Sequence, residues 1–345
     1  MHAVAYWGGT IYVGGEFTRA TWNGSEHRRN RLAAIDAATG ALLDWTPSAD
    51  GTVTDIAVDS SGLYLVGDFQ AVNGKNRDNL AQLDPHTGRL RPVLEHRIYG
   101  HPKKVAVGHG RVYIGGTITS VDGQARSGAA AFDAASGALD QTWAPVLSGS
   151  VHSLLVSHDR VYLGGKFDDV NGVERTQKLA AVTPDTGQVD TSFVSRVHAF
   201  VNALQIDGDT LYAGVDGDGG RAEAMDLSGG PKWRVTLDGD VQTIAILDGL
   251  IYLGGHFDNV CRSESLGTVP GRPGSQCVDG SDQRIKLAAV DAGGVLQPWT
   301  ANASGTIGVR AMAASPELGQ LTAGGFFKYI GGASQPRFAL FTLPL

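Results

Sequence analysis

The chain lacks the features that mark several common functional classes. No apolar run approaches the roughly 18 residues that span a bilayer, so the sequence predicts no membrane span. Its 28 basic residues are scattered singly on a chain with a formal charge of −7, which leaves no basic tract for nucleic acid. The motifs of a nucleophile elbow, a zinc helix, a phosphate loop and a Cys-x-x-Cys pair are also missing. The sequence therefore supplies no catalytic motif and predicts no cofactor and no metal.

Cysteine is scarce. The two cysteines, Cys261 and Cys277, lie in one Gly/Ser/Pro-rich insertion, and a disulfide that closes this loop is the simplest interpretation. Such a bond indicates an oxidising compartment. We therefore expect a secreted or cell-surface protein. Because no charged-then-apolar leader precedes the first repeat, we expect the sequence to be a processed or truncated form.

What the sequence has in quantity is glycine, with 48 residues, and a repeated motif. Its copies are IYVGGEF from Ile11, LYLVGDF from Leu63, VYIGGTI from Val112, VYLGGKF from Val161, LYAGVDG from Leu211, IYLGGHF from Ile251 and LTAGGFF from Leu321. The spacing averages about 52 residues, the length of a four-stranded propeller blade. The sequence therefore predicts an all-β, seven-bladed β-propeller of four-stranded antiparallel blades, as one domain over residues 1–345.

Each blade is read as strands a, b, c and d, with strand a innermost. The predicted blades cover residues 1–50, 51–99, 100–148, 149–198, 199–238, 239–303 and 304–345. The last repeat stops after its third strand, so blade seven is expected to lack its outer strand or to receive it from residues upstream of Met1. The D-x-x-T-G turns between strands c and d, such as the turn from Asp36, are read as structural because their aspartates satisfy local backbone groups.

The loops carry a second pattern, seen as FQAVNGKNRDNLAQLD from Phe69 and FDDVNGVERTQKLAAV from Phe167, and strand d adds LDQTWAP at Leu139 and VDTSF at Val189. Together they resemble the delta-60 repeat, a β-propeller repeat of bacterial exported and surface proteins. The resemblance covers nearly the whole chain, although blade five departs from it. It implies a propeller outside the cytoplasm and implies no shared reaction.

Two sets of recurring residues are interpreted as architecture. The strand-d aromatics are expected to pack between neighbouring blades, and the arginines before strand c are expected to clamp loop carbonyls and carboxylates. The aromatics are Trp45, Trp143, Phe193, Trp233 and Trp299; the arginines are Arg29, Arg77, Arg126, Arg175 and Arg284. We therefore look for function where the repeat is broken.

The b-to-c loop is enlarged at residues 17–32 and 257–287 and shortened at 216–220, and these breaks fall on one face, the top. The starts of strands a reach the same face and carry one polar column: His2, Thr54, Lys103, His152, Asn202, Gln242 and Arg310. We expect this column to ring the mouth of the central channel. With His101 beside Lys103, it forms a cationic funnel suited to a carboxylate, a uronic acid or a sulfated sugar, although a polar ring is expected in any wet channel.

Trp22 is the best single candidate for contact because it lies in the enlarged first loop beside His27 and Arg28. An exposed indole next to hydrogen-bond donors can hold a sugar face or a partner protein, or it can simply cap its own loop. The favoured hypothesis is a non-catalytic secreted module that binds a glycan or a protein through the top face. One alternative is a polysaccharide lyase that uses Tyr99, His101, Lys103, His152 and Arg310; another is a purely architectural domain docked through blade seven.

Overall fold

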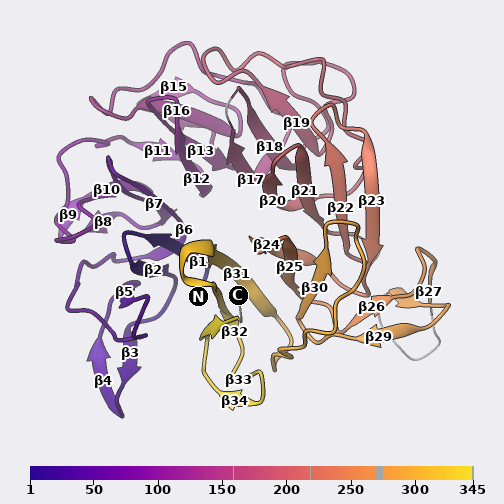
Figure 1. Ribbon diagram of the computed structural model, residues 1–345. Helices are drawn as coiled ribbons and strands as arrows, with labels where there is room; N and C mark the ends of the chain where they lie inside the picture. Colours follow the sequence, from indigo (N-terminus) through magenta and orange to yellow (C-terminus); the bar gives the residue numbers. More distant parts are fainter. Residues whose placement is uncertain (158, 218, 269–274, 344–345) are drawn as a thin grey trace. The chain divides into compact units, whose positions relative to one another are not determined.

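The computed structural model describes residues 1–157, 159–217, 219–268 and 275–343. It forms two compact units, unit 1 (Met1–Thr191) and unit 2 (Ser192–Leu345). Over the described ranges the regular structure is β, apart from one 3-10 helix, η1 (Pro316–Leu318) (Figure 1). Antiparallel sheets of three or four strands follow one another along the chain, as the predicted β-propeller fold requires. The seven-bladed ring, the single domain and the blade boundaries stay predictions.

Unit 1 holds five three-stranded sheets: four blade sheets, ordered β1-β2-β5, β6-β7-β10, β12-β13-β16 and β17-β18-β19, and the small sheet β11-β14-β15. Its strands are β1 (Ala3–Trp7), β2 (Thr10–Gly14), β3 (Arg19–Trp22), β4 (Ser25–Arg28), β5 (Leu32–Asp36), β6 (Thr52–Asp59), β7 (Gly62–Asp68), β8 (Ala71–Val72), β9 (Lys75–Asn76), β10 (Leu80–Leu83), β11 (Ile98–Tyr99), β12 (Pro102–Gly108), β13 (Arg111–Gly116), β14 (Ser120–Val121), β15 (Gln124–Ala125), β16 (Ala129–Asp133), β17 (Ser150–Val156), β18 (Val161–Lys166) and β19 (Leu179–Val182). Of the strands outside the four blade sheets, β11 lies on the connection before β12 and pairs with β14, and the others form the b-to-c hairpins.

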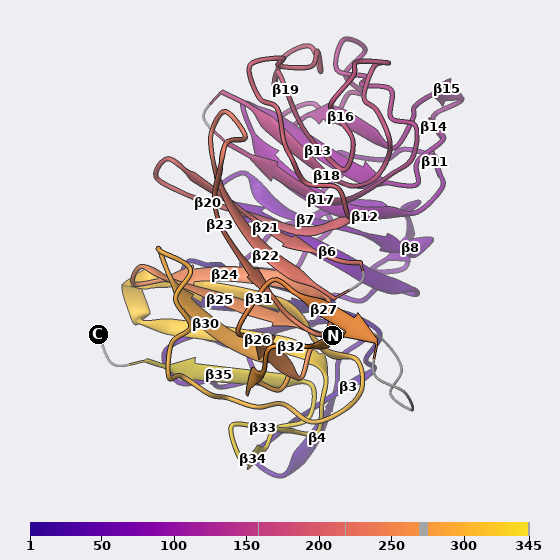
Figure 2. The ribbon, with the colours of Figure 1, turned by 90° about the vertical axis from the view of Figure 1, so that its right-hand side faces the viewer.

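Unit 2 holds the sheets β20-β21-β22-β23, β24-β25-β30 and β31-β32-β35 (Figure 2). Its strands are β20 (Val201–Asp207), β21 (Thr210–Val215), β22 (Arg221–Asp226), β23 (Pro231–Thr236), β24 (Val241–Leu247), β25 (Leu250–Gly255), β26 (Asn259–Cys261), β27 (Leu266–Thr268), β28 (Ser275–Cys277), β29 (Ser281–Gln283), β30 (Leu287–Asp291), β31 (Gly308–Ser315), β32 (Gln320–Phe326), β33 (Tyr329–Ile330), β34 (Ala333–Ser334) and β35 (Phe338–Thr342). Within residues 308–343 the last sheet has no strand beyond β35. How that edge is completed stays a prediction.

Within the described ranges, the predicted outer strand d is a full strand in the fifth repeat alone, where β23 pairs with β22. In five other repeats it shrinks to single bridges: Ile35–Leu42, Leu83–Leu90, Phe132–Leu139, Val182–Val189 and Val290–Leu296. The third repeat shows why the strand ends so early. The Asp140 carboxylate accepts hydrogen bonds from the backbone N–H groups of Thr142 and Trp143, at 2.8 and 3.0 Å, so these groups are lost to the ladder.

The strand-d tryptophans do pack between consecutive blades, as predicted. Trp143 is fully buried, meets Tyr113 edge to face at 4.9 Å, and donates its Nε1–H to the Thr183 carbonyl of the next blade at 3.1 Å. In unit 2, Trp233 makes the equivalent bond to the Ala292 carbonyl at 2.8 Å. A buried indole that satisfies its N–H in this way serves packing rather than ligand contact.

Four of the five predicted arginine clamps are present. Each guanidinium donates one hydrogen bond to the carbonyl of the preceding residue and one to a carbonyl of strand d. The strand-d acceptors are the carbonyls of Leu43, Arg91, Asp140 and Gln297, in that order for Arg29, Arg77, Arg126 and Arg284. The prediction for Arg175 is wrong, because this residue is exposed and lies four residues before strand c instead of three. The buried residue at the clamp position is Thr176, whose hydroxyl donates to the Val173 carbonyl.

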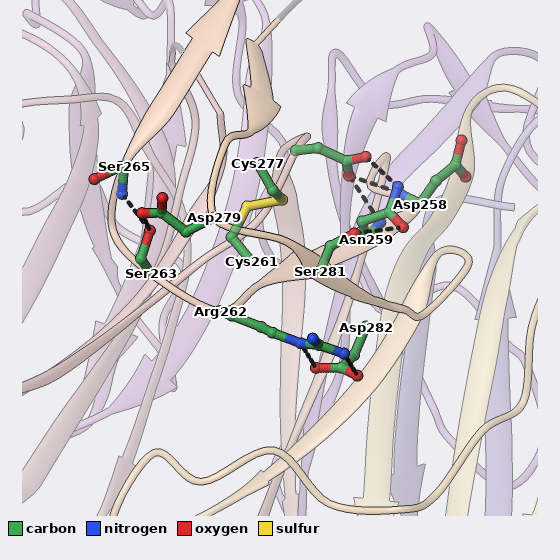
Figure 3. Close-up of a disulfide and its surroundings, with 11 residues drawn as sticks. Asp258, Asn259, Cys261, Arg262, Ser263, Ser265, Cys277, Asp279, Ser281 and Asp282 are labelled. Atoms are coloured by element: carbon green, nitrogen blue, oxygen red, sulfur yellow. Dashed lines mark hydrogen bonds and ion pairs between the residues drawn. A yellow bond between two sulfur atoms is a disulfide. The ribbon is translucent and has the colours of Figure 1, made fainter.

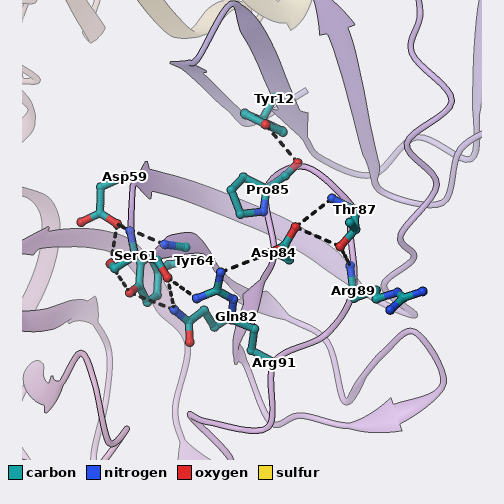
Figure 4. A network of polar contacts seen from close by, with 11 residues as sticks. Tyr12, Asp59, Ser61, Tyr64, Gln82, Asp84, Pro85, Thr87, Arg89 and Arg91 are labelled. Atoms are coloured by element: carbon teal, nitrogen blue, oxygen red, sulfur yellow. Dashed lines mark hydrogen bonds and ion pairs between the residues drawn. The ribbon is translucent and has the colours of Figure 1, made fainter.

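The D-x-x-T-G aspartates are structural, as predicted. In Figure 4 the Asp84 carboxylate accepts bonds from the Thr87 backbone N–H and hydroxyl, both at 2.9 Å. The same turn also joins two blades, because the Tyr12 hydroxyl donates to the Pro85 carbonyl at 3.1 Å. These bonds fix the c-to-d turns and leave their carboxylates occupied.

The paired glycines of the repeat have separate steric roles. A Cβ at the first, as at Gly115, would lie 2.6 Å from the Val151 side chain of the next blade. A Cβ at the second would lie about 2 Å from a backbone carbonyl of the same blade's strand a, for example 2.1 Å from His101 O at Gly116. The pair therefore lets strand b approach two strands a at once.

Candidate functional site

The polar column predicted from equivalent positions of the repeats coincides with a repeated irregularity of the backbone. In six strands a the register with strand b shifts by one residue, and the extra residue of each β-bulge is Thr54, Lys103, His152, Asn202, Gln242 or Arg310. A bulge takes its residue out of the ladder and redirects the side chain. The column is therefore a property of the fold. It lies where the second glycine of the pair lets strand b approach the backbone of strand a.

Each bulge lies at one particular end of its blade. Antiparallel pairing puts the start of strand a beside the end of strand b, as in Pro102 opposite Gly116, and the b-to-c hairpin leaves from the same end. We call this end of each blade the hairpin edge; in the third repeat it comprises residues 102–104, 115–116 and 120–125. In each of these six repeats, the bulge side chain therefore lies at the edge from which the b-to-c connection leaves.

Two neighbouring bulge residues of unit 1 contact each other. Lys103 Nζ lies 3.1 Å from His152 Nε2, and the Ser150 hydroxyl lies 2.9 Å from the same nitrogen. Burial lowers the pKa of Lys103, while the nearby Asp68 carboxylate opposes the shift. The structure thus brings Lys103 and His152 together in a partly buried, hydrogen-bonding cluster at the hairpin edge.

The other column residues of unit 1 have their own partners. His2 Nε2 lies 3.3 Å from Glu16 Oε1, and the Thr54 hydroxyl donates to the Pro102 carbonyl of the next blade at 3.2 Å. His101 is exposed and pairs with Asp68, at 2.6 Å between Nδ1 and Oδ1. Carboxylates therefore offset part of the cationic character expected for this edge.

One half-buried carboxyl of unit 1 connects two strands a. Asp55, the residue after the Thr54 bulge, accepts a bond from the Val105 N–H at 3.0 Å and lies 3.8 Å from Lys104 Nζ. Burial raises the pKa of Asp55, and the Lys104 ammonium only partly offsets it. This contact is structural and holds adjacent bulges in register.

In unit 2 a pair of acidic side chains, Asp216 and Asp240, lies beside the column residue Gln242. Asp240 precedes Gln242 by two residues, and its pKa is raised to about 7 by burial and by the Asp216 carboxyl, with which it shares a hydrogen bond. Asp216 belongs to the shortened hairpin turn; Asp218 of that turn lies outside the described residues. Sequence reasoning missed this pair because its members come from different loops and follow no repeat position.

The remaining column residues of unit 2 differ in character. Asn202 and Gln242 are half-buried amides at their bulges, and the guanidinium of Arg310 lies over the Phe326 ring, 5.3 Å from its centroid. Such cation–π contact fixes the orientation of the arginine. Whether all the column residues of both units line one mouth stays a prediction.

The enlarged first loop is a two-stranded hairpin, β3–β4, that extends from the hairpin edge of the first sheet (Figure 1). Trp22 pairs with Ser25 at its tip and is half-buried; His27 is half-buried and Arg28 is exposed. Arg28 Nε also donates to the Asn30 side chain at 3.4 Å. The hairpin therefore presents the predicted contact residues of the loop on a regular, ordered element.

The insertion in the sixth repeat is closed by a disulfide between Cys261 and Cys277, as predicted (Figure 3). Close to the bridge, Arg262 forms a two-point ion pair with Asp282 at 3.1 and 3.2 Å, and the Ser263 hydroxyl donates to Asp279. Residues 269–274 of the insertion lie outside the described residues. The bridge holds β26 and β28 together at the hairpin edge.

Over the described ranges, no group of three or more His, Cys, Asp or Glu side chains could hold a metal ion. In the same part of the chain, no helix has the length and apolarity needed to cross a membrane.

Comparisons with known proteins place the chain in a family. Curated proteins give no match. Similar solved structures include the computationally designed Ika8 protein (15% identity, 99% of this chain and 96% of that chain, TM-score 0.52), BamB from Moraxella catarrhalis (15%, 94% and 81%, 0.50) and a chain of the mitotic checkpoint complex (12%, 91% and 80%, 0.58). These likenesses show the fold. The family model described as outer membrane protein assembly factor BamB matches residues 2–192, more than half of the sequence, so this chain belongs to that family.

Proposed function

We propose that this chain is a non-catalytic recognition module that binds a partner protein outside the cytoplasm. The observation that carries the proposal is the β-bulge in six strands a, which presents a polar side chain at one edge of each blade. The description of the family as an assembly factor supports a protein partner.

The hairpin edge of unit 1 has the composition of a protein-binding surface. It combines Trp22 on the β3–β4 hairpin with the exposed Arg28 and the Lys103–His152 cluster. Tryptophan, tyrosine and arginine dominate the binding energy of protein interfaces, because they bury large areas and donate directed hydrogen bonds. A surface built on strands and short hairpins also loses little conformational entropy on binding.

Placement outside the cytoplasm rests on two independent features. The Cys261–Cys277 disulfide is typical of oxidising compartments, and the loop motifs resemble the delta-60 repeat of exported bacterial proteins. A glycan is the second candidate ligand for the same surface, favoured by the indole of Trp22 beside the donors His27 and Arg28.

The lyase hypothesis and the architectural hypothesis can each be tested separately. A lyase on acidic polysaccharide is favoured by the contact between Lys103, His152 and Ser150, and would show turnover that His152→Ala abolishes. The open edge of β35 favours an architectural domain that docks through this strand. Such a domain would lose its partner when the edge of β35 is altered and keep it when the hairpin edge is altered.

The proposed function is tested by mild chemical crosslinking in the native host, followed by isolation of the tagged chain. We expect a discrete protein adduct with the parent chain that is lost from a Trp22→Ala, Arg28→Ala variant. Ser60→Ala is the matched control, because Ser60 is exposed in the turn between β6 and β7, at the opposite end of its blade from the bulge. The same adducts from all three chains would contradict the proposal.

A further inference from the structure

The b-to-c hairpins are held down by a repeated side-chain cap. In four repeats a single oxygen accepts bonds from two successive backbone N–H groups at the start of the hairpin, at 2.8 to 3.0 Å. The capping residues are Asp50, Ser148, Asp238 and Ser304. The first three lie four residues before their bulge residue, on the d-to-a connection. A short polar side chain is therefore the architectural requirement at this position.

The third repeat breaks this rule. The residue four positions before the Lys103 bulge is Tyr99, whose side chain has no carboxylate or aliphatic hydroxyl to cap the hairpin. Its backbone carbonyl accepts the Thr119 N–H at 2.9 Å instead, and its side chain is 53% exposed. The hairpin therefore lacks the stabilising side-chain cap and carries an exposed aromatic ring in its place.

This ring lies in a cleft of about 620 Å³ in unit 1. The cleft runs between the β8–β9 hairpin and the small sheet β11-β14-β15, and its lining includes Asn76, Asp78, Glu95, Arg97, Tyr99 and Asp122. Its volume falls within the range of natural small-ligand sites, but its lining is more polar than such sites usually are. A polar ligand therefore fits the cleft better than an apolar one.

The wall of the cleft is held rigidly. His96 bridges Asp122 and the Gly137 carbonyl, each at 2.7 Å, and Asp122 also accepts the Arg97 backbone N–H at 2.8 Å. Glu95 pairs with the buried clamp Arg77 at 3.3 Å. Groups whose hydrogen bonds fix them in place lose little entropy when a ligand binds.

Two charged side chains of the cleft lining have no hydrogen-bond or ion-pair partner among the described residues. Over the residues that the structure describes, neither the Asp78 carboxylate nor the Arg97 guanidinium takes part in a hydrogen bond or an ion pair within 4.0 Å. One can accept hydrogen bonds from a ligand and the other can donate them. The lining carries the carboxylates of Asp78, Glu95 and Asp122 and the guanidinium groups of Arg77 and Arg97, so a ligand of either charge meets groups of its own sign and an uncharged ligand fits best.

We propose that this cleft, defined by Tyr99, Asp78 and Arg97, is a binding site for a neutral carbohydrate. Hydroxyl groups of the sugar donate to Asp78 and accept from Arg97, while the C–H face of the sugar ring packs on Tyr99. The site is separate from the Trp22 hairpin and the Lys103–His152 cluster, so the proposal stands or falls independently of the partner protein.

The test is the purified chain on an array of neutral oligosaccharides of glucose, galactose, mannose and N-acetylglucosamine, beside uronic-acid and sulfated oligosaccharides, with calorimetry on the hits. We expect binding to neutral glycans, weakened about tenfold or more by Tyr99→Ala. The matched control is Tyr329→Ala, because Tyr329 is also an exposed hairpin tyrosine, at 56%, whose hairpin keeps its Ser304 cap. This control should bind as the parent does.

A second variant separates ligand contact from folding. Tyr99→Asp installs the cap found at Asp50 and Asp238, so the hairpin should be at least as stable as in the parent while binding is lost. The proposal is overturned if the parent binds no neutral glycan on the array or prefers the acidic set. It is equally overturned if Tyr99→Asp binds like the parent, or if Tyr329→Ala weakens binding as much as Tyr99→Ala.

Discussion

Gly165→Ala tests the steric origin of the bulge that carries His152. A Cβ at this position would lie 2.2 Å from the Ser150 carbonyl oxygen and 2.9 Å from the His152 backbone nitrogen. Both are backbone atoms, so no side-chain rotation relieves the clash, and strand a must move by about 1 Å to reach an ordinary contact distance. Overpacking of this kind costs about 1–3 kcal/mol, and we expect the upper end. The melting temperature should fall by about 6 °C, taking roughly 2 °C per kcal/mol.

The assay is thermal and denaturant unfolding by circular dichroism, with Gly293→Ala as the control. A Cβ at Gly293 would meet only the Asp291 carboxylate, at 3.3 Å, and a side chain can give way. We expect the control to stay within about 0.5 kcal/mol of the parent. NMR of the His152 ring should also report a changed environment, because the bulge that bears it must shift. Equal stability of Gly165→Ala and Gly293→Ala would contradict a close steric contact between Gly165 and strand a.

Three further predictions follow from other contacts. Stability should fall as pH rises from about 4 through about 7, because the raised pKa of Asp240 makes its ionisation unfavourable in the folded chain; Asp240→Asn should flatten the pH profile of unfolding. Trp143→Ala should cost about 3–5 kcal/mol in denaturant unfolding, since the indole is fully buried, and a loss under 1 kcal/mol would contradict its packing role. Reduction of Cys261–Cys277 should free the insertion, giving faster proteolysis there and little change in hydrogen exchange of β24 and β25.

The repeat predicted most of the architecture because equivalent positions meet equivalent steric demands. The paired glycines, the Trp143 column and the D-x-x-T-G turns recur since each blade must approach the next in the same way. The polar column was also found by alignment alone. The cause of this column is a bulge opposite the second glycine. The sequence did not reveal it, because a sequence pattern does not show which residue is left unpaired in the β-ladder.

The errors arose where one residue of loop length or one local hydrogen bond decides the outcome. Arg175 misses the clamp position by one residue, and Thr176 takes it with different chemistry. Strand d ends after a single bridge because Asp140 takes up the backbone N–H groups that follow. The Asp216–Asp240 contact joins two separate loops, so no repeat pattern could have revealed it.

If a partner protein binds the hairpin edge of unit 1, site-specific photo-crosslinking in the native host should capture the contact. A photoreactive amino acid replaces Trp22 in one chain and Ser60 in another, so that the same chemistry samples the two ends of a blade. We expect one discrete protein adduct from position 22 and none from position 60. No protein adduct from position 22, or equal adducts from both positions, would contradict binding at this edge.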